Sequence, residues 1–337
     1  MNRFIYILPL LLVTLSSCFK EDERIEPMER GEKTTVTIEM TQQYKYQVYF
    51  SLEEGKAIAT IDKQSHDLLF DSRPGRSGIY MNTANFMMAA ATGKNNFQDV
   101  TSASGYNFQF DASSGHPDTL AIPGWFTVNG SDTAYSRQVF LINRGFDELG
   151  NQLGFRKIIF DSLKGNTYYF RHARLNENTG TQAQISKRPG RNFVNFSLGQ
   201  QPGLVEAQPD SRLFDLIFTQ YTTLLYTNTG QPYPYLVTGV LLNPENTWCA
   251  VDSTMQFDAI TREHALEMEY TNKPDIVGYD WKRVVGDVST GIVFYEVRSE
   301  RNHLIKTKTG YYFKMRFIGF YNNNGEKGYP TIEFQRL

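Results

Sequence analysis

An internal repeat constrains the fold of this chain more than any other feature of its sequence. The first copy is VYFSLEEGKAIATIDKQSHDLLF at residues 48–70, and the second is VNFSLGQQPGLVEAQPDSRLFDLIF at residues 194–218. Both contain Phe-Ser-Leu and then Asp-Leu-x-Phe, and each half closes on a similar stretch, FRHARL at residues 170–175 and IEFQRL at residues 332–337. Matches that recur in register indicate a duplicated structural unit. The sequence therefore predicts two similar units in tandem.

The hydrophobic pattern within these units is that of β-strands. Apolar and polar residues alternate at residues 36–40, 44–50 and 311–317, which is the period of a strand with one buried face. The 24 Phe and 20 Tyr residues of the chain also favour strands. Helical spacing is weak, and the one short helix candidate covers residues 258–270. We therefore predict an all-β fold with two similar antiparallel β domains in tandem.

The ends of the repeat and the local composition set the expected domain boundaries. The first domain is predicted at residues 34–178 and the second at residues 192–337, and each is long enough to bury its own core. Residues 179–191 contain a single aliphatic side chain, Ile185, together with Gly180, Pro189 and Gly190. That composition is typical of a linker.

The N-terminal segment resembles an export signal. Residues 4–15 are apolar but too few to span a bilayer, which takes about 20 residues, so residues 1–17 are predicted to be a signal peptide. The sequence LSSC that ends at Cys18 resembles a bacterial lipobox, which predicts a lipid anchor on Cys18 and a tether over residues 18–33. The residues that follow resemble a signal for export to the outer face of the outer membrane: Lys20, Glu21 and Asp22.

Composition and motifs argue against several classes of function. The formal net charge is -2 and no basic cluster is present, so no nucleic-acid partner is expected. With Cys18 lipidated, Cys249 has no partner for a disulfide and is expected to be a small buried residue. Nucleophile elbows, phosphate-binding glycine loops and zinc-spaced histidine pairs are missing from the sequence. We expect a binding protein that is not an enzyme and has no separate metal site.

Three segments resemble the HmuY-like family. They are YKYQVYFSLEEGKAIATIDKQSHDLLF at residues 44–70, DIVGYDWK at residues 275–282 and IKTKTGYYFKMRFIGFYNNNGEKGYPTIEFQRL at residues 305–337. Both halves carry the opening and closing patterns, so the resemblance covers nearly the whole chain after the signal. It implies an all-β lipoprotein of the outer membrane, exposed at the cell surface, that binds haem for iron acquisition beside a TonB-dependent receptor.

The resemblance also indicates where an iron ligand is expected. Family members hold haem iron between two axial side chains on loops, and one of them lies a few residues after a Trp. Here the runs that follow Trp125 and Trp281, residues 126–130 and 282–286, contain neither His nor Met. A ligand needs an imidazole or thioether with a free lone pair. The candidate haem-binding residues therefore lie elsewhere in the sequence: His116, Met255, His264 and Met268.

Each candidate also has a structural interpretation. His116 lies in the polar loop DASSGHPDTL, where an exposed His without a role is common, although loops also carry function. His264 and Met268 are four residues apart and would share one face of a helix, which core packing explains as well as ligation does. Met255 lies nearby and has the same two interpretations. The second half is the better candidate, because three of the four residues are close in sequence there.

The other three histidines are expected to have no role as ligands. His66 stands where the second copy has Phe214, and His172 stands where it has Phe334, so both are expected to fill structural positions. His303 opens a predicted strand and is expected at the surface.

Two other functions remain open at this point. The many Tyr and Trp residues could form platforms for sugars, as in a surface glycan-binding or adhesive module. The protein could also be a structural accessory of a receptor complex. Haem binding predicts a Soret shift on titration, whereas glycan binding predicts a response to oligosaccharides.

Overall fold

The computed structural model describes residues 30–287, 290 and 292–337. The predicted signal peptide and the predicted anchor and export signal, Cys18, Lys20, Glu21 and Asp22, lie outside the described residues. The described part is nearly all β, with one short α-helix, which confirms the predicted fold class.

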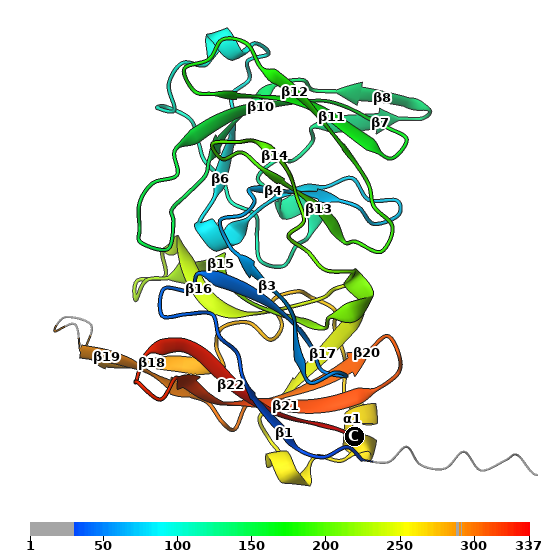
Figure 1. Cartoon of the computed structure of the whole chain (residues 1–337), viewed down its shortest axis with the longest axis vertical. Coiled ribbons are helices and arrows are strands. Elements are labelled where there is room, and N and C mark those ends of the chain that lie inside the picture. Colours follow the sequence, from blue (N-terminus) through cyan, green and yellow to red (C-terminus); the bar gives the residue numbers. More distant parts are fainter. Residues whose placement is uncertain (1–29, 288–289, 291) are drawn as a thin grey trace, which may run out of the picture.

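The described chain forms two lobes, one above the other in Figure 1. Lobe 1, at the top, contains β4 (Leu68–Asp71), β5 (Ile79–Met81), β6 (Met88–Ala91), β7 (Phe126–Asn129), β8 (Asp132–Tyr135), β9 (Val139–Asn143), β10 (Phe155–Lys164), β11 (Thr167–Arg174), β12 (Thr181–Ser186), β13 (Phe193–Ser197) and β14 (Gly203–Val205). Lobe 2, at the bottom, contains β1 (Thr34–Thr37), β2 (Tyr46–Ser51), β3 (Lys56–Asp62), β15 (Leu216–Tyr226), β16 (Pro232–Leu242), β17 (Thr247–Asp252), α1 (Arg262–Glu267), β18 (Lys282–Asp287), β19 (Ile292–Val297), β20 (Asn302–Thr307), β21 (Tyr312–Tyr321) and β22 (Lys327–Arg336).

Each lobe has a five-stranded sheet, a four-stranded sheet and a separate hairpin. In lobe 1 the strand orders are β12-β11-β10-β9-β6 and β14-β13-β4-β5, with the hairpin β7-β8. In lobe 2 they are β1-β22-β21-β20-β17 and β3-β2-β15-β16, with the hairpin β18-β19. The two lobes have the same order when strands eleven apart in number are matched, so that β4 corresponds to β15 and β11 to β22.

The first three strands of each copy are exchanged between the lobes. β1, β2 and β3 precede lobe 1 in the sequence but complete the sheets of lobe 2, whereas β12, β13 and β14 complete lobe 1. The Phe-Ser-Leu strand of each copy therefore pairs with the Asp-Leu-x-Phe strand of the other copy. Phe50 lies opposite Leu216 in lobe 2, and Phe196 lies opposite Leu68 in lobe 1.

Buried aspartates join the exchanged strands at equivalent positions. In lobe 2 the Asp215 carboxylate accepts a hydrogen bond from the backbone N–H of Leu52 at 2.8 Å. In lobe 1 the Asp67 carboxylate accepts one from the backbone N–H of Leu198 at 2.5 Å. Each bond links Phe-Ser-Leu of one copy to Asp-Leu-x-Phe of the other. The two repeated motifs of the sequence are therefore the two sides of one contact, which the fold makes twice.

This exchange corrects the predicted domain boundaries. Residues 34–178 and 192–337 follow the two copies of the strand order, but neither range contains all the strands of a lobe. The predicted linker, residues 179–191, contains β12, which pairs with β11 at the edge of lobe 1. Ile185 is the one fully buried side chain of β12. An edge strand that buries so little has the composition of a linker, which is why the sequence did not reveal it.

Each lobe has its own apolar core, and each core contains one tryptophan. Trp125 belongs to the core of lobe 1 and Trp281 to that of lobe 2. A hairpin begins directly after each of them, β7-β8 after Trp125 and β18-β19 after Trp281. The position that the family resemblance associates with an iron ligand is therefore a projecting hairpin in both lobes (Figure 1).

The helix predicted at residues 258–270 is present but shorter than expected. α1 covers only Arg262–Glu267. The hydroxyl of Thr261 caps it by accepting a hydrogen bond from the backbone N–H of His264 at 3.4 Å. Met268 follows α1 in extended backbone, so it does not share a helical face with His264. Within the described residues, no helix has the length and apolar character needed to cross a membrane.

Candidate functional site

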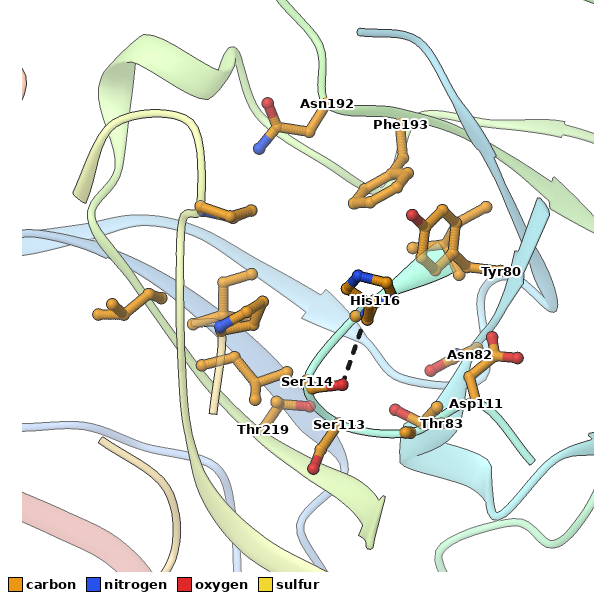
Figure 2. Close-up of a pocket in the computed structure, with 18 of the residues that line it drawn as sticks. Tyr80, Asn82, Thr83, Asp111, Ser113, Ser114, His116, Asn192, Phe193 and Thr219 are labelled. Atoms are coloured by element: carbon orange, nitrogen blue, oxygen red, sulfur yellow. Dashed lines mark hydrogen bonds between the residues drawn. The ribbon is translucent and has the colours of Figure 1, made fainter. Parts of the chain in front are cut away.

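A cleft of about 630 Å³ lies between the two lobes. Lobe 1 contributes the loop at residues 111–117, Tyr80 of β5 and Phe193 of β13, and lobe 2 contributes Tyr49 of β2 and the loop at residues 271–274. Figure 2 shows side chains from both lobes around one open space. Sites for small molecules and cofactors commonly have volumes of about 300–1,000 Å³. The cleft is therefore large enough for an organic cofactor.

The walls of the cleft are mainly aromatic and aliphatic. Tyr80 and Phe193 meet edge to face, with ring centroids 5.1 Å apart. Ile217 and Leu241, from the paired strands β15 and β16, line the side that belongs to lobe 2. Such walls suit a flat apolar ligand, because rings and aliphatic groups can cover both of its faces.

Three cationic side chains also line the cleft. The buried guanidinium of Arg73 forms a salt bridge with Asp71 at 2.6 Å, so its charge is already compensated. Arg76 and Lys273 are about half exposed and lie farther from their carboxylate neighbours, at 3.6 Å and 3.3 Å. An anionic group at the rim of the cleft would compete with these carboxylates for the two cations.

Polar contacts join the two lobes around the cleft. The Ser113 hydroxyl donates to the Asp275 carboxylate at 2.5 Å, and Arg73 reaches Glu245 of lobe 2 at 3.2 Å. Because these bonds connect loops of lobe 1 with loops of lobe 2, they define the separation of the lobes. The cleft is therefore bounded by direct contacts between the two lobes.

Of the candidate ligands from the sequence, His116 is the one that lines this cleft (Figure 2). Its backbone N–H donates to the Ser114 hydroxyl at 3.4 Å, and its Nδ1 accepts a hydrogen bond from the backbone N–H of Asp118 at 3.3 Å. The side chain is 64% exposed. Within the described chain no hydrogen bond to Nε2 is found, so this nitrogen has no protein partner. Because Nδ1 accepts a hydrogen bond, the neutral form of the ring carries its proton on Nε2 in this arrangement.

His66 and Asp111 line the cleft as well, but both make hydrogen bonds within the protein that give them structural roles. His66 is buried, its Nδ1 lies 3.1 Å from the Ser65 hydroxyl, and burial lowers its pKa to about 4, which keeps the ring neutral. Burial likewise raises the pKa of Asp111 to about 6. The Asp111 carboxylate accepts the backbone N–H groups of Met81 and Ala121 at 2.6 Å and 2.8 Å. The structural role expected for His66 agrees with this placement.

The other three candidates lie in lobe 2, and none of them lines the cleft. Met255 and Met268 are partly buried and pack against the same small apolar cluster. The Nε2 atom of His264 lies 2.9 Å from the carboxylate of Asp252 on β17, which holds the ring in place. Packing and a hydrogen bond to Asp252 account for these residues. In the described part of the chain, no group of three or more His, Cys, Asp and Glu side chains is arranged to hold a metal ion.

The placement of His303 differs from the expectation. His303 is 0% exposed rather than at the surface. β20 is an inner strand of a five-stranded sheet, between β17 and β21, so the start of this strand is covered. Burial lowers the pKa of His303 to about 3, so the ring is neutral beside Phe317. His172 is buried against Phe196, as expected for a structural residue.

The sequence analysis identified one residue that lines the cleft, His116, but it did not predict the cleft. Its walls come from segments far apart in the chain, among them β2, β5, β13 and β15, and no local pattern marks them. The one usable signal was the polar loop around His116, which is too rich in Ser, Gly and Pro to be a strand.

Comparison with solved structures finds proteins of low sequence identity. The apo crystal structure of an HmuY analogue from Tannerella forsythia shows 11% identity and a TM-score of 0.25, with 92% of this chain and 98% of that chain covered. A protein from Bacteroides vulgatus ATCC 8482, described as HmuY-like and heme-binding, shows 18% identity and a TM-score of 0.19, with 40% and 79% covered. A protein from Bacteroides fragilis NCTC 9343, described as a lipoprotein, shows 15% identity and a TM-score of 0.19, with 53% and 88% covered.

Sequence comparison is more decisive. None of the curated protein sequences matches this chain significantly. The model of the HmuY protein family, however, matches residues 43–334, which include nearly every strand of both lobes. This chain belongs to the HmuY protein family.

Proposed function

We propose that this protein binds haem in the cleft between its lobes, with His116 as a ligand of the iron. One observation carries the proposal: a histidine whose Nε2 has no partner within the described chain lines a largely apolar cavity of about 630 Å³. The family resemblance supports haem as the ligand. The proposed role is capture rather than catalysis.

The residues of the cleft fit the parts of a haem molecule. The macrocycle is flat and apolar, and Tyr80, Phe193 and Ile217 would cover its faces. The propionates are anionic, and Arg76 and Lys273 would pair with them at the rim. When bound, haem would supply an iron that accepts a nitrogen of the His116 imidazole.

Ligation requires one particular tautomer of His116. Iron would take the lone pair of Nε2, so the proton of the neutral ring must move to Nδ1, which then gives up the hydrogen bond that it accepts from the backbone N–H of Asp118. The Asp118 carboxylate lies 3.5 Å from Nδ1 and would accept that proton in a hydrogen bond. Carboxylates behind metal-bound histidines commonly have this role. Asp118 would therefore orient the ring.

Titration with hemin tests the proposal. The wild-type protein should give a saturable change in the Soret band, and the His116→Ala variant should bind hemin about ten-fold more weakly or worse, since an axial bond is lost. His264→Ala is the matched control, because it removes a histidine that is held by Asp252 away from the cleft. Its affinity for hemin should equal that of the wild type.

Binding of iron-free protoporphyrin measures the contribution of the cleft walls apart from that of the iron ligand. Without iron there is no axial bond, so wild type and His116→Ala should bind protoporphyrin equally. A wild type that shows no saturable Soret change would refute haem binding. If His116→Ala binds hemin as tightly as wild type, haem binding stands but its ligand is another residue.

We further propose that Cys18 anchors the protein by a lipid to the outer membrane, at the cell surface. The lipobox-like sequence and the residues Lys20, Glu21 and Asp22 support this location. In that setting the protein would deliver haem to a TonB-dependent receptor, as the family resemblance implies.

A further inference from the structure

A second cavity, of about 330 Å³, lies in lobe 1. It is lined by residues of the neighbouring strands β10, β11 and β12, by Phe196 of β13 and by Pro202 of the loop that follows β13. Two arginines and a histidine line it as well: Arg156, His172 and Arg174. None of the residues that line this cavity lines the cleft, so the two are distinct. We call it the arginine cavity.

The register of two strands brings two positive charges together at this cavity. Arg156 and Arg174 lie directly opposite each other on β10 and β11, which are adjacent in lobe 1 (Figure 1). Side chains at such positions of an antiparallel pair point to the same face, with Cβ atoms about 4.5–5.5 Å apart. Like charges placed in this way destabilise the pair. An anion held beside both side chains would relieve the repulsion.

Arg156 is a buried cation that lacks a carboxylate partner in the described part of the chain. The residue is 8% exposed, and its guanidinium donates to backbone carbonyls, that of Phe155 at 3.0 Å and that of Gly199 at 3.1 Å. Burying a charge is costly unless a counter-ion and hydrogen bonds compensate it. Burial accordingly lowers the pKa of Arg156, and the positive charges of Arg144 and Arg174 lower it further.

The acidic groups that act on Arg156 are engaged by other arginines. Asp67 pairs with Arg144 at 2.8 Å. Glu177, the one carboxylate that lines the cavity, lies 4.0 Å from the guanidinium of Arg174 and accepts the backbone N–H of the same residue at 2.7 Å. The lining therefore has two guanidinium groups and a single carboxylate, and its net charge is positive.

His172 adds a third polar group to the arginine cavity. The residue is 7% exposed, and its ring packs against that of Phe196 with the centroids 5.5 Å apart. No hydrogen bond to either ring nitrogen is found within the described chain. A buried imidazole that lines a cavity without a protein partner can donate a hydrogen bond to an anion there.

The repeat shows that the fold does not need these polar side chains. In lobe 2 the equivalent register places Phe313 opposite Arg336, so Phe313 corresponds to Arg156. Phe334 corresponds to His172 in the same way. Both phenylalanines belong to the core of lobe 2. Lobe 1 thus has an arginine and a histidine at two positions where its counterpart has core aromatic rings.

The corresponding cavity of lobe 2 also differs in charge. It has a volume of about 390 Å³ and is lined by Glu32 and Glu53 beside a single arginine, Arg336. In the repeated sequence Phe-Ser-Leu is followed by Glu53 in one copy and by Gly199 in the other. Lobe 1 therefore has fewer acidic and more cationic groups at this place, which favours an anionic ligand in lobe 1 alone.

We propose that the arginine cavity binds a phosphate group. The guanidinium groups of Arg156 and Arg174 would contact its oxygens from adjacent strands, and the ring of His172 would donate to a further oxygen. A tetrahedral phosphate has enough oxygens for three donors that approach from different sides, whereas a carboxylate has two. The cavity of about 330 Å³ has room for free phosphate and for the phosphate of a small monoester.

Isothermal titration of the full-length protein with inorganic phosphate, glycerol 3-phosphate and acetate tests the proposal. At least one of the two phosphate probes should bind saturably with a Kd below about 1 mM, and acetate should bind at least about ten-fold more weakly. Tighter binding of glycerol 3-phosphate would identify a monoester as the ligand, and tighter binding of inorganic phosphate would identify the free anion.

Arg156→Phe is the principal variant, because it copies the side chain that lobe 2 has at the equivalent position, Phe313. It should bind the phosphate probe about ten-fold more weakly or worse, since a charge-assisted contact is lost. Saturating phosphate should raise the unfolding midpoint of the wild type but not that of this variant. Arg174→Gln is the second variant and should lose affinity to a similar extent. Its side chain is 55% exposed, so the replacement leaves the core intact.

Arg171→Gln is the matched control. Arg171 also lies on β11, but the alternation of the strand places it on the opposite face from Arg174, where it pairs with Asp161 at 2.7 Å. This variant should bind the phosphate probe as the wild type does. The proposal is overturned if neither phosphate probe binds saturably, if acetate binds as tightly, if Arg156→Phe and Arg174→Gln keep the wild-type affinity, or if Arg171→Gln loses affinity equally.

Discussion

Lys282 shows how this fold places an ionisable side chain among aromatic rings. The amine is buried against Trp281, Tyr295 and Phe320. Burial lowers the pKa of Lys282 from 10.5 to about 7. In the unfolded chain the amine keeps its ordinary pKa, so between these two values the unfolded state binds more protons than the folded state. The free energy of unfolding therefore rises with pH across this window and falls as pH is lowered toward 7.

We expect the Lys282→Met variant to lose this part of the pH dependence, because Met binds no proton. The contribution of a single group cannot exceed about 1.4 kcal/mol per pH unit. Urea unfolding at about pH 7.5 and about pH 9.5 measures it as the difference between the slopes of wild type and variant. Lys308→Met, at an exposed lysine, is the control and should keep the wild-type slope. Equal slopes for Lys282→Met and wild type would contradict this account of the buried amine.

The candidate residues show how far a sequence can identify a site. His116 was found because its loop is polar, and that loop does face the cleft. Met255, His264 and Met268 were grouped because they are close in sequence, yet an apolar cluster and Asp252 account for them. Proximity along a chain with many antiparallel strands says little about proximity in space. Tyr80 and Phe193, the rings that meet in the cleft, are far apart in the sequence.

At the scale of elements, the exchange of strands sets which fragments can fold. Residues 64–210 contain every strand of lobe 1, from β4 to β14, in one continuous piece. Residues 34–178 have a similar length but lack β12, β13 and β14, and they carry β1, β2 and β3 without their partners. We expect the fragment 64–210 to unfold cooperatively as a monomer and the fragment 34–178 to be much less stable.

Circular dichroism, urea unfolding and size-exclusion chromatography of the two fragments check this expectation. Fragment 34–178 could gain order by pairing with fragment 179–337, so an equimolar mixture is the informative control and should give a folded one-to-one complex. A stable monomer from 34–178 alone, as resistant to urea as 64–210, would show that the pairing is not exchanged.

The strands could be predicted from the sequence, but their partners could not. Alternation of apolar and polar residues identified β2 and β21, because a half-buried strand leaves that period in the sequence. Pairing was ambiguous for a physical reason: both copies carry Phe-Ser-Leu and Asp-Leu-x-Phe, so either copy could satisfy Asp67 or Asp215. Local sequence cannot choose between two equal partners, and the choice depends on the whole chain.

At the scale of the molecule, the chain enters the described structure at lobe 2. The Arg30 guanidinium donates to the side-chain carbonyl of Gln335 on β22 at 2.9 Å, and the backbone N–H of Gly31 donates to the carbonyl of Arg336 at 3.0 Å. A lipid on Cys18 would therefore connect to lobe 2, while lobe 1 and the cleft lie beyond it (Figure 1).

Replacing Cys18 with Ala tests the anchor. The thioether to the lipid cannot form on Ala, so the variant should move from the detergent phase to the aqueous phase in Triton X-114 partitioning. Changing Lys20, Glu21 and Asp22 together to Ala is the companion variant, which should keep the lipid but lose protease accessibility on intact cells. A Cys18→Ala protein that still partitions into detergent would contradict lipidation at this residue.

The exchanged strands also bear on how such a gene can change. A deletion that removed one whole copy would take three strands from one lobe and eight from the other, since each copy supplies both. The surviving copy could not inherit either lobe intact. Because the two copies exchange strands, the loss of one copy would disrupt both lobes. Substitutions in one copy at a contact between the copies must also remain compatible with the other copy.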